Sequence, residues 1–131
     1  MLNNEFLIGT KLIKNYADPF VIAEAGSNHN QSKDTALKLI DVAAEAGANA
    51  IKFQLFVAEK LYPAGTELHE IFKSIELNRD WLPELFEHTK DCGIEFLASP
   101  FDRDSADLLD TLGVSAYKIA SAEIDNRPLL A

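Results

Sequence analysis

The chain has 131 residues, of which 47% are hydrophobic, enough to form the core of one globular domain. Twenty-one acidic and twelve basic residues give a formal net charge of -9, which argues against a broad nucleic-acid-binding surface. No apolar stretch approaches the roughly 20 residues of a membrane span, the N-terminus lacks the apolar core of a secretory signal, and the single cysteine, Cys92, suits a reducing compartment, so we predict a cytoplasmic protein.

The first part of the chain predicts a hairpin followed by alternating strands and helices. The segment FLIGTKLI, Phe6 to Ile13, contains two apolar runs broken by Gly9-Thr10, so we assign residues 1–16 to a hairpin that flanks a larger body. The expected elements that follow are a buried strand at Phe20 to Ala23, a helix from Lys33 to Ala46, a strand from Asn49 to Gln54, a long excursion from Val57 to Thr66 and a short helix around Glu67 to Ile75.

The same alternation continues to the end of the chain. The further expected elements are a helix from its N-cap Asn78 through Cys92, a strand at Ile94 to Ala98, a helix capped by Asp102 and ended by Gly113, and a fourth strand at Ala116 to Ala120. Such alternation predicts an α/β fold with a parallel sheet, either a barrel or an open doubly wound sheet. A barrel needs about 250 residues, so we interpret residues 17–131 as the N-terminal half of a longer domain.

Polar residues follow each predicted strand. The four groups are Glu24 to His29, Lys52 with Gln54, Ser99 with Pro100, and Lys118 to Glu123. The carboxyl ends of parallel strands wrapped by helices meet on one rim, where polar groups from distant parts of a chain converge. The pattern therefore predicts one side of an enzyme active site.

The first two groups indicate a site for an anion. Lys52 and Gln54 point to the same side of their strand, whereas Phe53 points away. An inward lysine is costly unless an anion or a carboxylate compensates it, which favours a phosphate or carboxylate substrate. Glu24 is either a general acid or base, a ligand for substrate hydroxyls, or the ion-pair partner of Lys52. The lone His29 is a ligand, a proton carrier or a brace of the loop, and the structural or orienting role is favoured because metal sites need three or more protein ligands.

The last two groups extend this interpretation. Ser99 is either an anion contact or part of an ordinary Ser-Pro turn. Lys118 is expected to face inward opposite Lys52, and two inward lysines need at least one strong anion. Alternatively, a buried Lys118 forms a Schiff base, as in class I aldolases.

Four segments together resemble the sialic acid synthase family, which includes N-acetylneuraminate, legionaminate and pseudaminate synthases. They are FVIAEAGSNHNQS, ANAIKFQLF, GIEFLASPFD and AYKIASAEIDNRPLL, in that order, and they cover most of Phe20 to Leu130. Four motifs in family order are far more specific than any one of them. The resemblance implies a TIM (β/α)8 barrel, of which this chain supplies an N-terminal hairpin and about the first four strands.

The resemblance also implies a reaction and a role for each site residue. The family condenses phosphoenolpyruvate with an N-acetylated hexosamine, such as N-acetylmannosamine, to a nine-carbon 2-keto sugar acid and releases phosphate. The residues that would hold the carboxylate and phosphate of phosphoenolpyruvate are Lys52, Ser99, Lys118 and Ser121. Gln54 and Glu123 would contact the amino sugar or a water near the metal, and the acid or base is either Glu24 or Glu123.

Some family features have no counterpart in these residues. The divalent metal, Mn or Mg, uses two histidines that match nothing here, so we predict no metal site in this chain and expect the ligands beyond residue 131. The antifreeze-like domain that helps form the family homodimer is also missing, and Gln31 replaces a glycine of many members. We expect a homodimeric transferase as the intact parent and an inactive isolated fragment. The alternatives are the lysine Schiff-base aldolase and a noncatalytic half-barrel.

Overall fold

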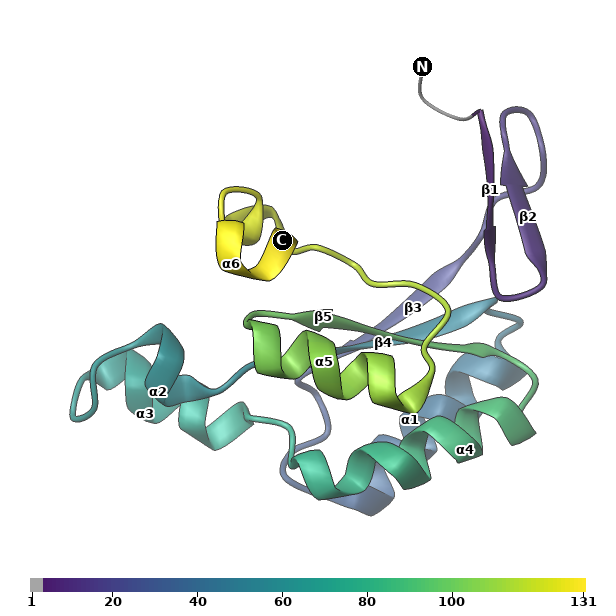
Figure 1. The fold of residues 1–131 in the computed structure, drawn as a ribbon. Coiled ribbons are helices and arrows are strands. Elements are labelled where there is room, and N and C mark those ends of the chain that lie inside the picture. The colour runs from purple at the N-terminus through teal and green to yellow at the C-terminus, as the bar shows by residue number, and fades with distance from the viewer. Residues whose placement is uncertain (1–3) are drawn as a thin grey trace.

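A computed structural model describes residues 4–131 as a hairpin and a three-stranded parallel sheet covered by helices (Figure 1). Strands β1 (Glu5–Ile8) and β2 (Lys11–Lys14) form the antiparallel hairpin. Strands β3 (Ile22–Gly26), β4 (Ala50–Leu55) and β5 (Glu95–Pro100) lie in the order β3-β4-β5. The α/β class and the parallel sheet are therefore confirmed.

The helices connect these strands and follow them. They are α1 (Lys33–Glu45), α2 (Ala58–Leu61), α3 (Glu67–Ile75), the 3-10 turn η1 (Arg79–Trp81), α4 (Leu82–Asp91), α5 (Arg103–Leu112), the 3-10 turn η2 (Ser121–Glu123) and α6 (Arg127–Leu130). Ser32 caps α1 by accepting from the Thr35 N–H, and Asp102 caps α5 by accepting from the Ser105 N–H. None of the helices within residues 4–131 is long and apolar enough to cross a bilayer.

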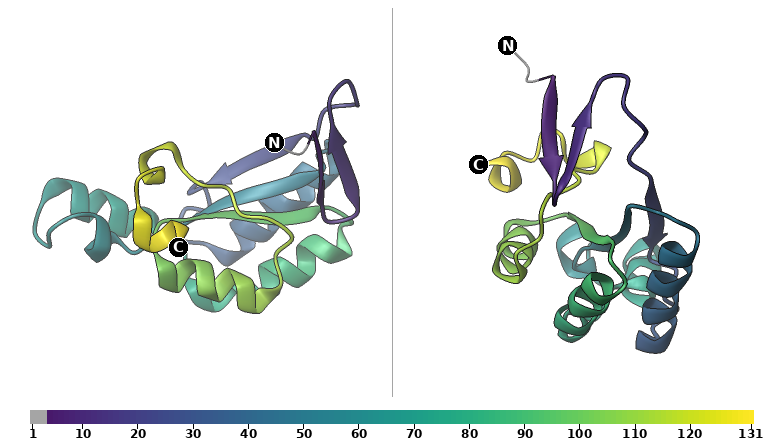
Figure 2. Two further views of the ribbon diagram at one scale, coloured as in Figure 1. Left: turned by 45° about the horizontal axis from the view of Figure 1, so that its top comes forward. Right: turned by 90° about the vertical axis from the view of Figure 1, so that its right-hand side faces the viewer.

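The core lies between one face of the parallel sheet and the helices α1, α4 and α5. Figure 2 shows these helices on one side of the sheet and the hairpin and C-terminal segment on the other. The largest buried side chains on the helix side include Phe53, Leu55 and Ile51 of β4, Phe96 of β5, Ile40 of α1, Leu82 and Leu85 of α4 and Leu109 of α5. Burying each such side chain contributes roughly 1.5–3 kcal/mol, so this layer holds the three strands in place.

The hairpin tip packs against the start of β5. Gly9 has φ +58, and a Cβ atom there would collide with the carboxylate of Glu95. The hairpin predicted across Phe6 to Ile13 is thus confirmed as β1 and β2. Residues 1–3 of the predicted 1–16 segment lie outside the described residues, and the division into 1–16 and 17–131 stays a prediction.

Four predicted boundaries were wrong by a few residues. The first strand of the sheet starts at Ile22 and runs through Gly26, because its pairing with β4 begins only after Pro19 and Phe20. Strand β5 continues to Pro100 because it pairs with β4 along its whole length. The excursion at Val57 contains the short helix α2, and Asn78 caps the 3-10 turn η1, not α4 itself.

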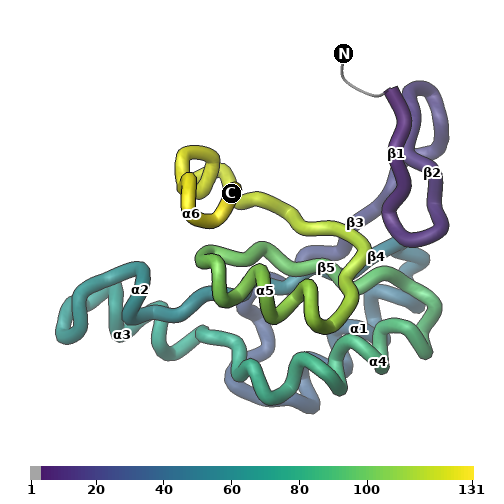
Figure 3. Tube along the Cα trace, viewed as in Figure 1, coloured from purple at the N-terminus to yellow at the C-terminus, as the bar shows by residue number. Residues whose placement is uncertain are grey.

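The predicted fourth strand, Ala116 to Ala120, is not formed as a strand. Its pairing is a single bridge between Tyr117 and Ala98, with the Lys118 N–H donating to the Ala98 carbonyl at 3.3 Å. A strand needs a continuous ladder, and one bridge fixes only one residue of this segment. Figure 3 shows the chain leaving α5, passing back above the sheet and ending at α6.

Candidate active site

One face of the parallel sheet is apolar and the other carries the polar residues singled out in the sequence. Laterally paired residues of parallel strands point to the same face. The register pairs Glu24 with Lys52 and Gln54 with Ser99, whereas Phe53 pairs with Ala98 in the core. Glu24, Lys52, Gln54 and Ser99 therefore share the face that the helices do not cover. This confirms that Lys52 and Gln54 point opposite to Phe53.

Lys52 is a largely buried cation with a carboxylate partner. Its ammonium forms an ion pair with the Glu24 carboxylate, and the Lys52 side chain is 11% exposed while that of Glu24 is 52% exposed. The pair is thus asymmetric: the cation is withdrawn from water and the anion is not. Of the roles considered for Glu24, the structure shows the ion pair with Lys52. The exposed part of the same carboxylate stays free to contact a ligand.

Gln54 and Ser99 extend the polar face toward the carboxyl ends of the strands. Ser27, in the loop after β3, donates its hydroxyl hydrogen to Gln54 Oε1 at 3.2 Å. Ser99 is buried and lies inside β5, so the Ser-Pro turn considered for it is wrong. Ser99 was predicted to follow the end of its strand, but it lies within the last two residues of β5.

The C-terminal polar group is placed differently from its prediction. Tyr117 pairs with Ala98 of the helix-covered face, so Lys118, the next residue, lies on the polar face with Lys52. Lys118 is exposed and makes no ion pair among the described residues, so the burial expected for it is not found. Ser121 is exposed in η2, and Glu123 accepts a hydrogen bond from Asn126 Nδ2 at 2.5 Å. Among the described residues, none of Lys118, Ser121 and Glu123 forms an ion pair or hydrogen bond with Lys52.

The loop from β3 to α1 is organised around a buried histidine. His29 Nδ1 accepts from the Gln31 N–H at 3.2 Å, and its ring packs edge to face on Trp81 at 5.9 Å. Burial lowers the pKa of His29, with the Ile75 backbone acting in the opposite direction. Its Nε2 has no hydrogen-bond partner within residues 4–131. The ring is thus neutral near pH 7 and orients the loop, in agreement with the role predicted for it.

Gln31 occupies a backbone conformation that favours glycine. Its φ is 54°, in the left-handed region, where a side chain costs roughly 1–2 kcal/mol. Its Nε2 donates to the Glu76 carbonyl at 2.7 Å. This hydrogen bond offsets part of the strain and ties the β3–α1 loop to the segment after α3.

A second charged cluster joins the loops that follow β4 and β5. Lys60 of α2 donates to Asp102 at 2.9 Å and to Asp104 at 2.6 Å. Burial alone would raise the pKa of Asp102, but the hydrogen bonds from Lys60 and Ser105 lower it below its ordinary value. In the sequence Asp102 is recognisable only as a helix cap, and Lys60 gives no signal because α2 was not expected within the excursion.

The polar face does not by itself assemble a metal site. Among the residues that the structure describes, three convergent metal-ligating side chains occur at one place, in the helix layer. Glu24 is engaged with Lys52, and Glu123 is bonded to Asn126. These donors do not fit a divalent ion on the polar face.

Known proteins resemble the chain over nearly its whole length. A model of the NeuB family matches residues 39–131. The spore coat polysaccharide biosynthesis protein SpsE of Bacillus subtilis is 40% identical over 136 residues, covering 95% of this chain and 36% of that protein. The N,N'-diacetyllegionaminic acid synthase of Campylobacter jejuni is 40% identical over 124 residues, covering 84% of this chain and 37% of that enzyme.

The structure of the chain also resembles that of a solved protein of this kind. The structure of an N-acetylneuraminic acid synthetase from Leptospira borgpetersenii, in complex with citrate, matches with a TM-score of 0.90 at 38% identity. The match covers 96% of this chain and 44% of that one. The chain spans about a third of the length of the curated relatives that it matches.

Proposed function

The chain belongs to the NeuB family, and from this premise we propose that the whole protein condenses phosphoenolpyruvate with an N-acetylated hexosamine. The product is a nine-carbon 2-keto sugar acid, and phosphate is released. The sugar is N-acetylmannosamine or a relative of it. Similarity to sialic, legionaminic and pseudaminic acid synthases supports this reaction class.

The observation that carries the proposal is the largely buried Lys52 ammonium beside Gln54 and Ser99. Lys52 is 11% exposed on the open face of a parallel sheet, and its partner Glu24 is 52% exposed, so an anionic ligand can approach the ammonium from the same face. Phosphoenolpyruvate carries a carboxylate and a phosphate. In the proposed complex Lys52 and Ser99 bind these groups, and the exposed side of the Glu24 carboxylate contacts the sugar or transfers a proton.

The remaining residues act from the C-terminal segment. Lys118 and Ser121 are proposed to bind the same anion, and Gln54 and Glu123 to contact the amino sugar or the attacking water. Lys118 and Ser121 are exposed and available for this when a fourth strand is completed. The acid or base remains either Glu24 or Glu123.

The bonds change in two steps. Carbon 3 of phosphoenolpyruvate attacks the aldehyde carbon of the open-chain sugar, which forms the new carbon–carbon bond, leaves a cation at carbon 2 and converts the aldehyde oxygen to an alkoxide. In the second step water adds to carbon 2, and one of its protons passes through a carboxylate to the alkoxide, which becomes a hydroxyl group. The bond between carbon 2 and the phosphate oxygen then breaks, and the remaining hydroxyl proton passes to the departing phosphate, which gives the keto group and inorganic phosphate. Lys52 neutralises the anion throughout these steps, and a carboxylate accepts the proton of the water.

The whole protein is proposed to be a TIM (β/α)8 barrel, with residues 17–131 as its N-terminal half and residues 1–16 as the flanking hairpin. Three parallel strands in sequential order, each followed by helix, support this architecture. A homodimer and a cytoplasmic location belong to the same proposal. The isolated chain is expected to be inactive, because residues 4–131 supply only part of the proposed active site.

A divalent ion, Mn or Mg, would act as a Lewis acid on the sugar aldehyde oxygen in such a reaction. On the polar face of residues 4–131, Glu24 is paired with Lys52, and the one cluster of three metal-ligating side chains lies elsewhere, in the helix layer. Its ligands are therefore proposed to come from outside this chain.

The test is a product assay. The full gene product containing this chain is incubated with manganese, phosphoenolpyruvate and N-acetylated hexosamines of the three synthase classes, and phosphate and keto acid are measured. We expect both products in equal amounts with one sugar class. Absence of product with all three classes, from a folded protein, would refute the proposal.

A Schiff-base aldolase is not favoured by the surroundings of Lys118. Such an enzyme needs an amine kept uncharged by burial, whereas Lys118 is exposed. Borohydride reduction in the presence of substrate should leave Lys118 unlabelled, and a covalent adduct on it would support the aldolase instead.

A further inference from the structure

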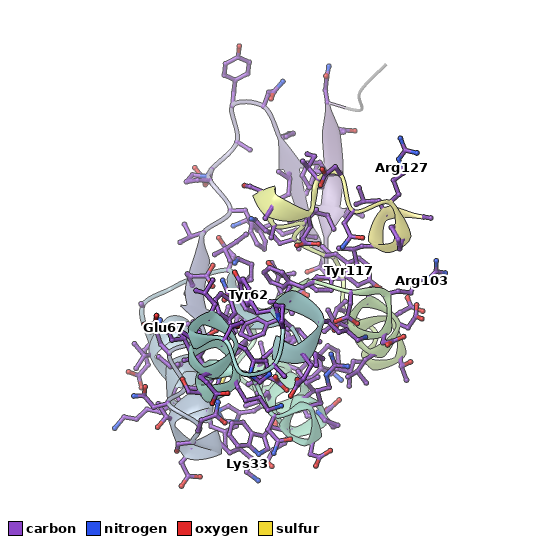
Figure 4. All side chains as sticks on the ribbon, turned by 90° about the vertical axis from the view of Figure 1, so that its left-hand side faces the viewer. Lys33, Tyr62, Glu67, Arg103, Tyr117 and Arg127 are labelled. Carbon is purple, nitrogen blue, oxygen red and sulfur yellow. The ribbon has the colours of Figure 1, made fainter. Side chains whose placement is uncertain are left out.

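Three side chains from two helices converge on the helix side of the sheet, away from the polar face. Asp41 lies in α1, and His88 and Cys92 lie at the C-terminal end of α4. One ligand atom from each lies within 4.8 Å of the other two. Figure 1 shows α1 and α4 packed in the layer below the sheet, and Figure 4 places Lys33 of α1 in that layer, with Arg127 beyond the sheet.

The distances resemble the edges of a tetrahedral zinc site. Cys92 Sγ lies 3.8 Å from His88 Nε2 and 3.7 Å from Asp41 Oδ1. Ordinary zinc bond lengths place a sulfur about 3.6 Å from a nitrogen or oxygen ligand of the same ion. His88 Nε2 and Asp41 Oδ1 are 2.7 Å apart, a hydrogen-bonding distance. The two atoms need to move apart by about 0.7 Å, to about 3.4 Å, the distance between a nitrogen and an oxygen ligand of a tetrahedral zinc ion.

The same geometry does not suit a Cys-His-Asp nucleophile. In that arrangement the carboxylate and the thiol use different nitrogens of the histidine ring. Here Asp41 and Cys92 both approach Nε2 of His88. The three donor atoms converge on one point and do not form a chain of hydrogen bonds through the ring. This arrangement indicates a metal-ion site and not an activated thiol.

The ligand types select the ion, and their exposure makes the position accessible. A thiolate, an imidazole and a carboxylate suit Zn²⁺, whereas Mg²⁺ and Ca²⁺ prefer oxygen ligands alone. The side chains of His88 and Asp41 are 34% and 48% exposed, which leaves the fourth position to water.

We propose that Asp41, His88 and Cys92 form a zinc site that joins α1 to α4 on the outer helical layer. Binding forms a bond between zinc and the Cys92 sulfur, and the thiol proton passes to the solvent. The site lies on the opposite side of the sheet from Lys52 and Gln54, so it is independent of the proposed synthase reaction. Its effect is to stabilise the packing of α1 on α4.

The test uses metal alone, with a phosphine reductant that keeps Cys92 reduced. Cobalt chloride titrated into the 131-residue chain should produce a thiolate-to-cobalt absorption band that saturates at one ion per chain. Zinc chloride should abolish the band by displacing cobalt. It should also raise the Tm by a few degrees at zinc concentrations well above the Kd.

Variants separate this site from adventitious binding. Cys92→Ser should lose the thiolate band, and Asp41→Asn and His88→Gln should each weaken zinc binding at least tenfold. Asp91→Asn is the matched control, because Asp91 is next to Cys92 in sequence but does not belong to the cluster. It should bind zinc as the unmodified chain does. Absence of a band in the unmodified chain, or zinc affinity unchanged in Asp41→Asn and His88→Gln, would overturn the proposal. Equal weakening in Asp91→Asn would do the same.

Discussion

Replacing Glu24 with glutamine should destabilise the chain more than replacing Lys52 with methionine, although both changes break the same ion pair. The Glu24→Gln change leaves an ammonium group that is only 11% exposed without its countercharge. The Lys52→Met change leaves a carboxylate that is 52% exposed and can be hydrated. The difference follows from which of the two partners is withdrawn from water.

The expected magnitudes follow from the same exposures. Removing one partner of a fully buried pair costs about 3–5 kcal/mol, and the glutamine oxygen still accepts a hydrogen bond. We therefore expect a loss of about 1.5 kcal/mol for Glu24→Gln and of at most about 0.5 kcal/mol for Lys52→Met. With a slope of about 1.5 kcal/mol per molar urea, the first change lowers the unfolding midpoint by about 1 M.

Urea unfolding followed by circular dichroism measures both losses. The control pair is Lys33 with Glu84, whose charged atoms lie 2.6 Å apart but whose side chains are 40% and 53% exposed, so Glu84→Gln should leave the unfolding midpoint nearly unchanged. Equal losses for Glu24→Gln and Lys52→Met, or a larger loss for Lys52→Met, would show that burial of the ammonium does not govern this pair.

Three further changes test the loops that border the polar face. Gln31→Gly should be nearly neutral, because relief of left-handed strain offsets the lost hydrogen bond to Glu76, whereas Gln31→Ala should cost about 1 kcal/mol in urea unfolding; the reverse order would contradict this. Because burial lowers the pKa of His29, the unfolded chain binds a proton that the folded chain does not. The free energy of unfolding should thus fall as pH decreases through about 6.5, and His29→Gln should flatten this profile; an unchanged profile would speak against it. Asp102→Ala should lower stability by about 1–2 kcal/mol and Asp102→Asn by less, since asparagine retains the cap of α5; equal losses in thermal unfolding would contradict a contribution from the cap.

Periodicity and caps predicted most of the fold. The apolar stripe of α1 with Gly47 after it, the stripe of α4 and the cap and stop of α5 are local signals, and each helix formed within a few residues of its expected bounds. Alternation along β4 correctly separated Lys52 and Gln54 from Phe53, because side-chain direction in a strand depends only on residue parity.

What failed depended on partners that the local sequence does not contain. The fourth strand has the composition of a strand, but a ladder requires a neighbour along its length, and this segment makes one bridge through Tyr117. Tyr117 pairs with Ala98 of the helix-covered face, so Lys118 still lies on the polar face, but its side chain is exposed and not buried as expected. Ser99 lies inside β5 because pairing with Gln54 extends the strand past Ala98.

The cluster in the helix layer was missed for a different reason. His88 and Cys92 are four residues apart on one helix, a spacing that was visible in the sequence as neighbouring positions of one face. The third member, Asp41, is 47 residues from His88, and only the packing of α1 on α4 brings it close. A lone cysteine therefore gave no signal by itself.

The affinity of the full gene product for phosphoenolpyruvate, measured by calorimetry before and after Lys52→Met, tests the central claim most directly. Loss of a charge-assisted contact to the carboxylate or phosphate should weaken binding about 100-fold, while Lys33→Met, which removes a lysine of the helix layer, should leave it unchanged. Binding by Lys52→Met within twofold of the unmodified protein would contradict the role of this ammonium group as the anion site.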